Sequence, residues 1–290
     1  EQLHPDVINF DDQAVYENVF HKGRWAGIFQ FTEAGAQTFC VNAKPRSIID
    51  ISAITSIFRP GPLSAKVDKN YVDAKENPAA IKYLNDTVRD VTEETFGFLI
   101  FQEQIALLAH KLGGLTLDEG NMLRKVLTKK GTGKGNIKLK LKEKFVGGCS
   151  EKGISVRDSE KLWETFEFFS GYGFNKSHAV SYSILSYQCA WLFHYYPVEW
   201  IAAFLDKEPE SRKERAINAA KKMGFEIAPI DINLSDRDWQ IADDTKLVQP
   251  FSSVKGLGDA AIDQILNNRP FTDIEHFLFN EDMVYSKLNK

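Results

Sequence analysis

The chain has 290 residues, of which 43% are hydrophobic and 26% charged, and its formal net charge is -4. This composition is ordinary for a folded globular protein, and the length allows a sizeable core and two domains. No apolar run approaches the length that spans a bilayer, and no charged-then-apolar signal peptide opens the chain, so we expect no membrane partner.

The cysteines and histidines predict neither a disulfide framework nor a self-contained metal site. Three cysteines, Cys40, Cys149 and Cys189, are far apart in the sequence and form no CxxC pair. The six histidines form no HxH or HExxH pattern. We therefore expect a reducing, cytoplasmic setting.

Apolar periodicity predicts a mainly helical chain with a few short strands. Residues 11–39 are read as a helix followed by the short apolar segment GIFQF. Residues 47–58 have helical periodicity, which the prolines and glycine of residues 59–62 interrupt. Further along the chain we expect the following segments: helices over 98–112, 117–127 and 161–169; a long apolar helix over 177–205, interrupted at Pro197; a loop at 131–135; a charged stretch at 208–215; and a loop or short strand over 227–239.

The charge of the chain is concentrated in one basic strip. Residues 124–144 contain nine basic residues against one acid, Glu143, so this stretch carries +8 and the rest of the chain carries -12, which together give the total of -4. The basic residues are Arg124, Lys125, Lys129, Lys130, Lys134, Lys138, Lys140, Lys142 and Lys144. Such a strip can attract a polyanion, although a solvated lysine-rich helix gives the same pattern.

The segment GYGFNKSHA, residues 171–179, combines a glycine turn with a helix start. Asn175 or Ser177 can cap the helix, and Lys176 and His178 then lie where backbone N–H groups and the helix dipole favour an anion. This arrangement predicts a phosphate-binding element. An ordinary glycine-bounded helix start with exposed polar residues is the alternative.

Three other segments place cations or exposed N–H groups at turns and helix ends. Arg59 lies on the rigid turn FRPGPL, a suitable anchor for a phosphate. The segment LRKVLTKK aligns Lys125 with Lys129 on one helix face. The segment VKGLGDAAI, residues 254–262, fits a helix-hairpin-helix in which two glycines expose N–H groups to a DNA phosphate and Ile262 packs the second helix.

Seven segments in a fixed order resemble the fingers region of the bacterial C-family replicative DNA polymerases, the alpha subunit of DNA polymerase III and its relatives. They are GIFQF, FRPGPL, ETFGFLIFQEQ, LRKVLTKK, GYGFNKSHA, AWLFHYYPVEW and DINLS, within residues 27–269. The resemblance implies a helical fingers domain followed by a small helix-hairpin-helix unit. We expect the fingers domain over residues 1–205, a linker with the DIN-type segment over 206–243, and an incomplete helix-hairpin-helix DNA-binding unit over 244–290.

The resemblance also implies a function and a set of site residues. The chain is expected to be part of a template-directed DNA polymerase, a nucleotidyltransferase. The residues expected at the incoming dNTP are Arg59, Arg124, Lys125, Lys129, Tyr172, Lys176 and His178. The residues expected at DNA are Lys130, Lys134, Lys138, Lys140, Lys255, Gly256 and Gly258. Template-primer DNA and dNTP are the expected ligands, with the sliding clamp and other replisome subunits as further partners.

The chain also departs from the family pattern. The family's three aspartates that bind Mg²⁺ lie in the palm, and the sequence contains no PDxDxD segment. We therefore expect a palm-containing polymerase segment as partner, and no activity of the chain alone. A split gene, an intein-interrupted gene or a truncated record would each account for this. The family's second arginine is Lys125 here, and its GxM is Gly35-Ala36, which suggests a divergent, phage-like member.

Two other function classes remain open. A noncatalytic helix-hairpin-helix DNA-binding protein would keep the fold without the chemistry. A helix-hairpin-helix repair nuclease would need its own clustered carboxylates, for which Asp243 and Asp244 in a predicted turn are poor candidates.

Overall fold

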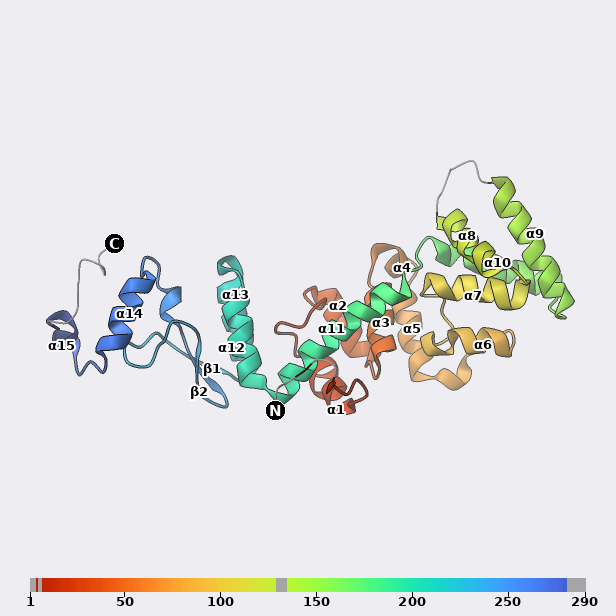
Figure 1. Cartoon of the computed structure of the whole chain (residues 1–290). Coiled ribbons are helices and arrows are strands. Elements are labelled where there is room, and N and C mark those ends of the chain that lie inside the picture. Colours follow the sequence, from red (N-terminus) through yellow and green to blue (C-terminus); the bar gives the residue numbers. More distant parts are fainter. Residues whose placement is uncertain (1–3, 5–6, 129–134, 281–290) are drawn as a thin grey trace. The chain divides into compact units, whose positions relative to one another are not determined.

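The computed structural model describes residue 4, residues 7–128 and residues 135–280, and these belong to two compact units. The first unit takes in residues 1–23 and 29–188, and the second takes in residues 24–28 and 189–290. The described part of the chain is mainly helical and contains a three-stranded sheet (Figure 1), which confirms the predicted fold class.

Helices make up the first unit. Their bounds are α1 Gln13–Val15, the π-helical η2 Tyr16–His21, α2 Ala34–Ala43, α3 Ile48–Ile57, α4 Pro60–Ser64, α5 Val67–Glu76, the 3₁₀ turn η3 Pro78–Ala80, α6 Asp86–Thr92, the 3₁₀ turn η4 Glu93–Thr95, α7 Gln102–Gly113, α8 Leu117–Thr128, α9 Gly135–Glu151, α10 Val156–Ser170 and the first part of α11 Lys176–Tyr195.

One core of the first unit lies between α7, α8, α9 and α10. Its buried residues include Leu108 of α7, Leu123 of α8, Phe145 of α9 and Trp163 of α10. The rings of Phe145 and Trp163 lie 5.7 Å apart. This packing makes the four helices one framework, from which α7 and α8 present their polar residues.

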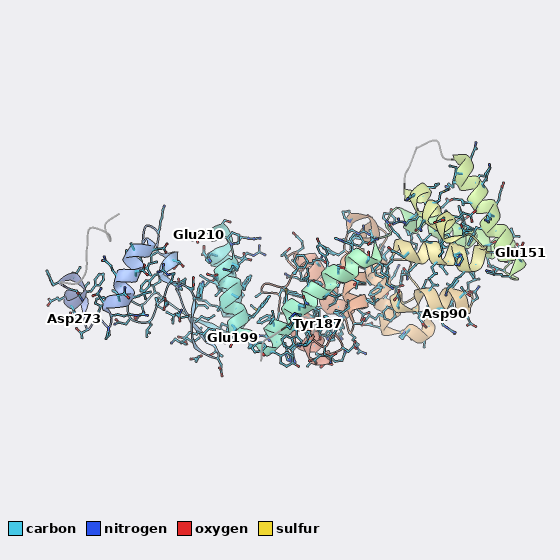
Figure 2. The ribbon with its side chains drawn as sticks, viewed as in Figure 1. Asp90, Glu151, Tyr187, Glu199, Glu210 and Asp273 are labelled. Carbon is cyan, nitrogen blue, oxygen red and sulfur yellow. The ribbon has the colours of Figure 1, made fainter. Side chains whose placement is uncertain are left out.

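The N-terminal segment packs on α11. Tyr187 of α11 (Figure 2) is fully buried, its ring lies 5.0 Å from that of Tyr16, and its hydroxyl donates to the carbonyl oxygen of Asn9. Ser52 of α3 donates to Ser183 of α11 at 3.0 Å. These contacts hold α11 against the N-terminal helices.

Two predicted helices begin or end elsewhere. The helix expected from residue 11 ends at His21, because Gly23, at φ 68°, turns the chain out of the helix. The helix expected from residue 98 begins at Gln102, because the Gln104 side chain accepts the N–H groups of Ile100 and Phe101 before the helix starts. The predicted breaks after Phe58 and at Pro197 are confirmed.

The second unit contains the end of α11, then α12 Pro197–Lys207, α13 Glu210–Lys222, β1 Glu226–Ala228, β2 Gln240–Asp243, β3 Lys246–Val248, the 3₁₀ turn η5 Phe251–Ser253, α14 Asp259–Asn268 and α15 Ile274–Leu278. The strand order is β1-β3-β2, with β1 parallel and β2 antiparallel to β3. Ile262 is 2% exposed and packs with Phe251, Ile265 and Phe271, which confirms its predicted packing role.

The predicted domain boundaries at residues 205 and 243 stay a prediction. The segment 131–134 of the predicted loop, and the end of the predicted unit at residues 281–290, lie outside the described residues. Among the helices that the structure describes, none has both the length and the apolar character needed to cross a membrane.

Candidate nucleotide and nucleic-acid site

The turn between α10 and α11, residues 171–175, is held by the start of α7. Gln102 N donates to Phe174 O at 2.9 Å, and Phe174 N donates to Ile100 O at 2.9 Å. The Gln102 side chain also donates to Gly173 O at 2.9 Å. A Cβ atom on Gly173 would lie 3.0 Å from Cγ of Gln102, so glycine allows this close approach. Two segments, in which Gln102 and Gly173 are 71 residues apart in the sequence, therefore form one backbone structure.

The start of α11 is capped by Asn175 and by a carboxylate from α7. Asn175 Oδ1 accepts the N–H of His178 at 2.8 Å, so of the two predicted caps Asn175 accepts a backbone N–H of the first turn. Glu103 accepts the Asn175 side chain at 2.9 Å and the Lys176 N–H at 3.0 Å. In this structure the anion at the helix start is therefore Glu103, where a helix N-terminus favours negative charge.

Arg59 reaches the same turn from the segment between α3 and α4. Its Nε donates to Ser56 O at 2.8 Å, and its guanidinium donates to the carbonyl oxygen of Tyr172. The guanidinium carbon lies 4.7 Å from the centre of the Phe174 ring. Burial lowers the pKa of Arg59 from its usual value, but an arginine remains charged at neutral pH. The Tyr172 ring lies so close to Gly61 that a Cβ there would come within 2.2 Å of it.

Arg124 of α8 is connected to the turn through Gln102. One of its terminal nitrogens donates to Gln102 Oε1 at 2.6 Å. Because Gln102 also holds Gly173, the guanidinium and the turn share one side chain. Lys125, the next residue, is exposed. Lys129, predicted to align with it, lies outside the described residues.

Lys176 forms an ion pair with η4. Its Nζ lies 2.6 Å from Oε1 of Glu94, and the two side chains are 32% and 35% exposed. The same nitrogen lies 5.6 Å from the centre of the Phe101 ring. The lysine predicted to contact a phosphate therefore has a carboxylate as its partner in this structure.

An aromatic row follows the first turns of α11. The ring of His178 lies 5.5 Å from Phe174 and 4.2 Å from Tyr182, and Tyr182 lies 5.4 Å from Phe29. His178 and Tyr182 are exposed. Sequence reasoning missed Tyr182, although its spacing of four residues from His178 places both side chains on one helix face.

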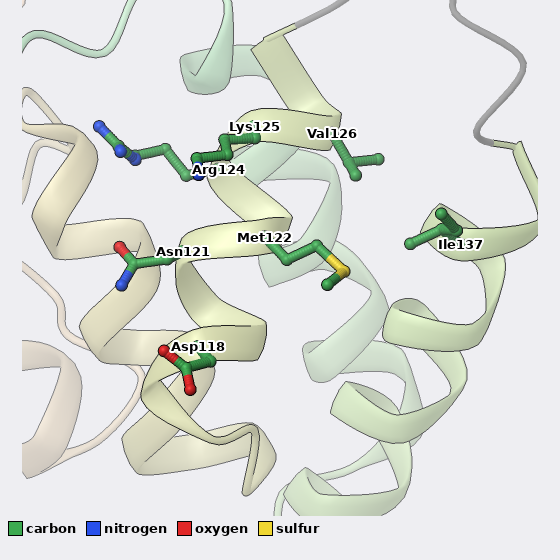
Figure 3. A pocket seen from close by; sticks show the side chains of 7 residues that line it. All are labelled: Asp118, Asn121, Met122, Arg124, Lys125, Val126 and Ile137. Carbon is green, nitrogen blue, oxygen red and sulfur yellow. The ribbon is translucent and has the colours of Figure 1, made fainter.

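A pocket of about 600 Å³ lies beside α8, lined by Asp118, Asn121, Met122, Arg124, Lys125, Val126 and Ile137. Figure 3 shows Met122 and Ile137 directed into the gap between α8 and α9, whereas Arg124 is directed the other way. Of the residues predicted to contact dNTP, the pocket includes Arg124 and Lys125. The structure thus connects Arg59, Arg124 and Lys176 to the turn before α11 and to the start of α7 that holds it. Their approach to one ligand stays a prediction.

Part of the basic strip is balanced by acids on neighbouring helices. Lys138 pairs with Glu167 of α10 at 2.9 Å, and Lys144 pairs with Glu119 of α8 at 2.7 Å. Lys140 is exposed on α9. Lys130 and Lys134 lie outside the described residues. In the described part of the strip, Lys140 is thus one residue placed to meet a polyanion from solvent.

The predicted hairpin of the second unit has an open backbone. Gly256 has φ 89°, which favours glycine, and Gly258 precedes the first turn of α14. A Cβ on either glycine would meet no heavy atom within 4 Å. Lys255 beside them is exposed. Arg237 pairs with Asp259 at 2.6 Å and with Asp263, so two acids near the hairpin have a cation partner.

Three of the motifs quoted above have packing roles. Trp200, at the end of AWLFHYYPVEW, donates to Ala26 O at 2.8 Å and lies close to Gly27 of GIFQF. Asn233 of DINLS accepts Phe271 N and donates to Phe271 O, each at 2.8 Å. These contacts stabilise the second unit without presenting chemistry.

The residues that the structure describes contain no group of three or more His, Cys, Asp or Glu arranged to hold a metal ion. The expected Mg²⁺ therefore has no such set of ligands among these residues.

Comparison with known proteins identifies the family of the chain. A family model described as "Bacterial DNA polymerase III alpha subunit finger domain" matches residues 1–153, and one described as "Helix-hairpin-helix motif" matches residues 224–289. The chain is similar to DNA polymerase III subunit alpha of Aquifex aeolicus (34% identity over 93% of this chain), of Thermus aquaticus (34% over 96%) and of Campylobacter jejuni (32% over 98%). The aligned part is 23%, 23% and 24% of these relatives, so the chain spans about a quarter of their length. The chain belongs to the family of the bacterial DNA polymerase III alpha subunit, and it matches the finger domain and the helix-hairpin-helix of that family.

Proposed function

We propose that this chain binds the triphosphate of an incoming dNTP and the template-primer DNA as part of a DNA-directed DNA polymerase. The observation that carries the proposal is the shared turn before α11. Arg59 contacts its Tyr172, Arg124 is connected to its Gly173 through Gln102, and Lys176 follows it directly. Family membership supports the polymerase assignment.

Each cation of the site has a proposed role. Arg59, Arg124, Lys125, Lys129 and Lys176 act on the triphosphate by charge and by hydrogen bonds that position it for in-line attack. Tyr172 and His178 contact the sugar or the base, and the exposed ring of Tyr182 extends that surface. Lys125 supplies charge without the fork of donors that an arginine has.

DNA contacts are proposed for two separate surfaces. Lys130, Lys134, Lys138 and Lys140 contact phosphates of the template or the duplex. In the second unit, the N–H groups of Gly256 and Gly258 and the charge of Lys255 bind a DNA phosphate. Because these contacts read only the backbone, base pairing supplies the sequence specificity.

The chemical step requires more than this chain. We propose that a palm-containing polymerase segment supplies the carboxylates for Mg²⁺, since the sequence has no PDxDxD segment. The sliding clamp and other replisome subunits are further proposed partners, in the cytoplasm. The chain alone is then inactive, and its contribution is binding and positioning.

A chimera tests the nucleotide site. This chain replaces the aligned region of the Thermus aquaticus alpha subunit, which is 34% identical over 290 residues. The chimera should extend a primer, whereas the 290-residue chain alone should not. Lys176→Ala in the chimera should lower kcat/KM for dNTP about tenfold or more, because a hydrogen bond to a charged group contributes about 1.5–3 kcal/mol. Affinity for primer-template DNA should change less than about twofold.

Primer extension by the pure chain would contradict the proposal that the chemical step requires a palm-containing segment. An inactive but folded chimera that still binds DNA would favour the noncatalytic DNA-binding protein. A Lys176→Ala variant that lost DNA affinity and kept its KM for dNTP would move Lys176 to the DNA surface.

The hairpin has a matched pair of tests. Gly258 is the N-cap of α14, with φ -85° and open space around it, so Gly258→Ala should destabilise the second unit by no more than about 1 kcal/mol. If a DNA backbone approaches the hairpin closely, the added methyl group should still weaken DNA binding several-fold. Asp244→Ala, in the exposed turn before β3, is the control. Unchanged DNA affinity of the Gly258→Ala variant would remove the hairpin from the DNA site.

A further inference from the structure

The ion pair between Lys176 and Glu94 places a carboxylate where the proposed function needs a phosphate. The Nζ–Oε1 distance is 2.6 Å, which is a short contact between an ammonium and a carboxylate oxygen. The Lys176 ammonium has three N–H donors but a single positive charge, so it cannot neutralise a carboxylate and a phosphate at the same time. The carboxylate and a nucleotide phosphate therefore compete for one cation.

Glu94 is held in place by a rigid neighbour. Thr95 is fully buried, and its hydroxyl donates to Phe98 O at 2.7 Å and accepts the Gln104 side chain at 2.8 Å. The backbone that carries Glu94 is thus fixed to the start of α7. The Lys176 N–H is fixed to that start as well, through Glu103. The two charged side chains extend toward each other from two anchored backbones.

The pair is nevertheless open to solvent. Lys176 is 32% and Glu94 35% exposed, so a ligand can reach the lysine and the carboxylate can leave into water. Arg59 differs, because it donates to the carbonyl oxygens of Ser56 and Tyr172. A neutral carbonyl oxygen competes with a phosphate less strongly than a carboxylate does.

We propose that Glu94 is an affinity-determining residue of the nucleotide site, whose carboxylate holds Lys176 in place of a nucleotide phosphate until the nucleotide displaces it. This inference rests on the proposed function. Binding of a polyphosphate exchanges the Lys176–Glu94 pair for a Lys176–phosphate pair and releases the Glu94 carboxylate to solvent. Glu94 thereby weakens nucleotide binding and keeps Lys176 ordered when no nucleotide is bound.

Calorimetric titration of the full 290-residue chain with inorganic tripolyphosphate tests the exchange. Glu94→Gln should tighten binding about fivefold, which corresponds to about 1 kcal/mol, the upper end for an exposed pair. Glu93→Gln is the matched control, because it removes the same charge from the adjacent exposed position. It should change the affinity less than about twofold. Circular dichroism spectra verify that each variant is folded.

Two further variants separate the exchange from simple repulsion. Glu94→Asp keeps the charge and shortens the side chain. If Glu94 acts through its ion pair with Lys176, this variant should tighten tripolyphosphate binding by part of the Glu94→Gln effect. If the negative charge of Glu94 only repels the ligand, Glu94→Asp should leave the affinity unchanged. In a Lys176→Ala background, Glu94→Gln should have no effect, because the lysine that it frees is absent.

Each remaining outcome overturns the inference. Equal gains from Glu93→Gln and Glu94→Gln would mean that only net charge matters. A gain that persisted without Lys176 would give Glu94 another partner. Tripolyphosphate binding that is unchanged in Glu94→Gln would refute the exchange and leave the nucleotide site intact. If no variant bound tripolyphosphate, the exchange would be wrong, and the KM of the chimera for dNTP would decide the proposed function separately.

Discussion

The packing of α9 on α7 requires a glycine at position 148, because there is no space for a side chain there. A Cβ on Gly148 of α9 would lie 2.2 Å from the carbonyl oxygen and 2.5 Å from the carbonyl carbon of Gly113 in α7. Both of these atoms are backbone, so no rotamer change can relieve the contact. Gly148→Ala must therefore move the two helices apart.

The expected loss of stability follows from the core contacts that this movement disturbs. Phe145 and Trp163 are fully buried beside this crossing, and the α7–α10 core closes over them. Overpacking of a core costs about 1–3 kcal/mol, and the backbone contact places this variant at the upper end. Alanine recovers up to about 1 kcal/mol through helix propensity. We expect Gly148→Ala to destabilise the first unit by about 2 kcal/mol.

Gly147 provides the matched control in the same helix. A Cβ there would meet no heavy atom within 4 Å, so Gly147→Ala should stabilise the unit by up to about 1 kcal/mol. The two variants should differ by about 3 kcal/mol, or about 6–12 °C in Tm. Urea unfolding measures the difference, and hydrogen exchange of α7 and α9 locates it. Two variants that agreed within about 0.5 kcal/mol would refute the packing argument.

Three other predictions concern single residues. Gln104→Met should lower the free energy of unfolding by about 2–4 kcal/mol, because it leaves the N–H groups of Ile100 and Phe101 without their acceptor. Urea titration measures this loss, and a loss below about 1 kcal/mol would contradict the prediction. Burial raises the pKa of Cys149 to about 11, so at pH 8 Cys149 should react with iodoacetamide more slowly than Cys189. Peptide mass mapping measures the two rates, and a faster reaction of Cys149 would contradict this prediction. Lys140→Ala should reduce the slope of log affinity for DNA against log salt by about one unit, and an unchanged slope would remove Lys140 from the interface.

Local sequence signals predicted the helices well where those signals are strong. The break after Phe58 follows from Pro60, which begins α4 at its first position, where proline is tolerated. Asp118 and Glu119 mark the first turn of α8. The helix expected to begin at residue 11, before the apolar segment GIFQF, ends at His21, because hydrophobic periodicity carries no information on the left-handed backbone at Gly23.

The cations of the candidate site were predictable from the sequence, but their partners were not. Arg59, Arg124 and Lys176 stand at turns and helix ends, where a pattern can identify them. Glu94 lies 82 residues from Lys176, and Gln102 lies 22 residues from Arg124. Such pairs depend on tertiary contacts, which neither spacing nor charge counts reveal. Nothing in the sequence assigns a role to the two glutamines of the segment ETFGFLIFQEQ.

The role of that segment follows from helix geometry. Successive residues of a helix point about 100° apart, so three neighbours at one helix start can serve three different segments. Gln102 reaches Arg124 and Gly173, Glu103 reaches Asn175 and the Lys176 N–H, and Gln104 holds the backbone before α7 in place. One turn of α7 thereby fixes α8, the turn before α11 and the start of α11 relative to one another. A substitution at this turn should consequently alter several cations of the site together, whereas a substitution of one cation should leave the positions of the others unchanged.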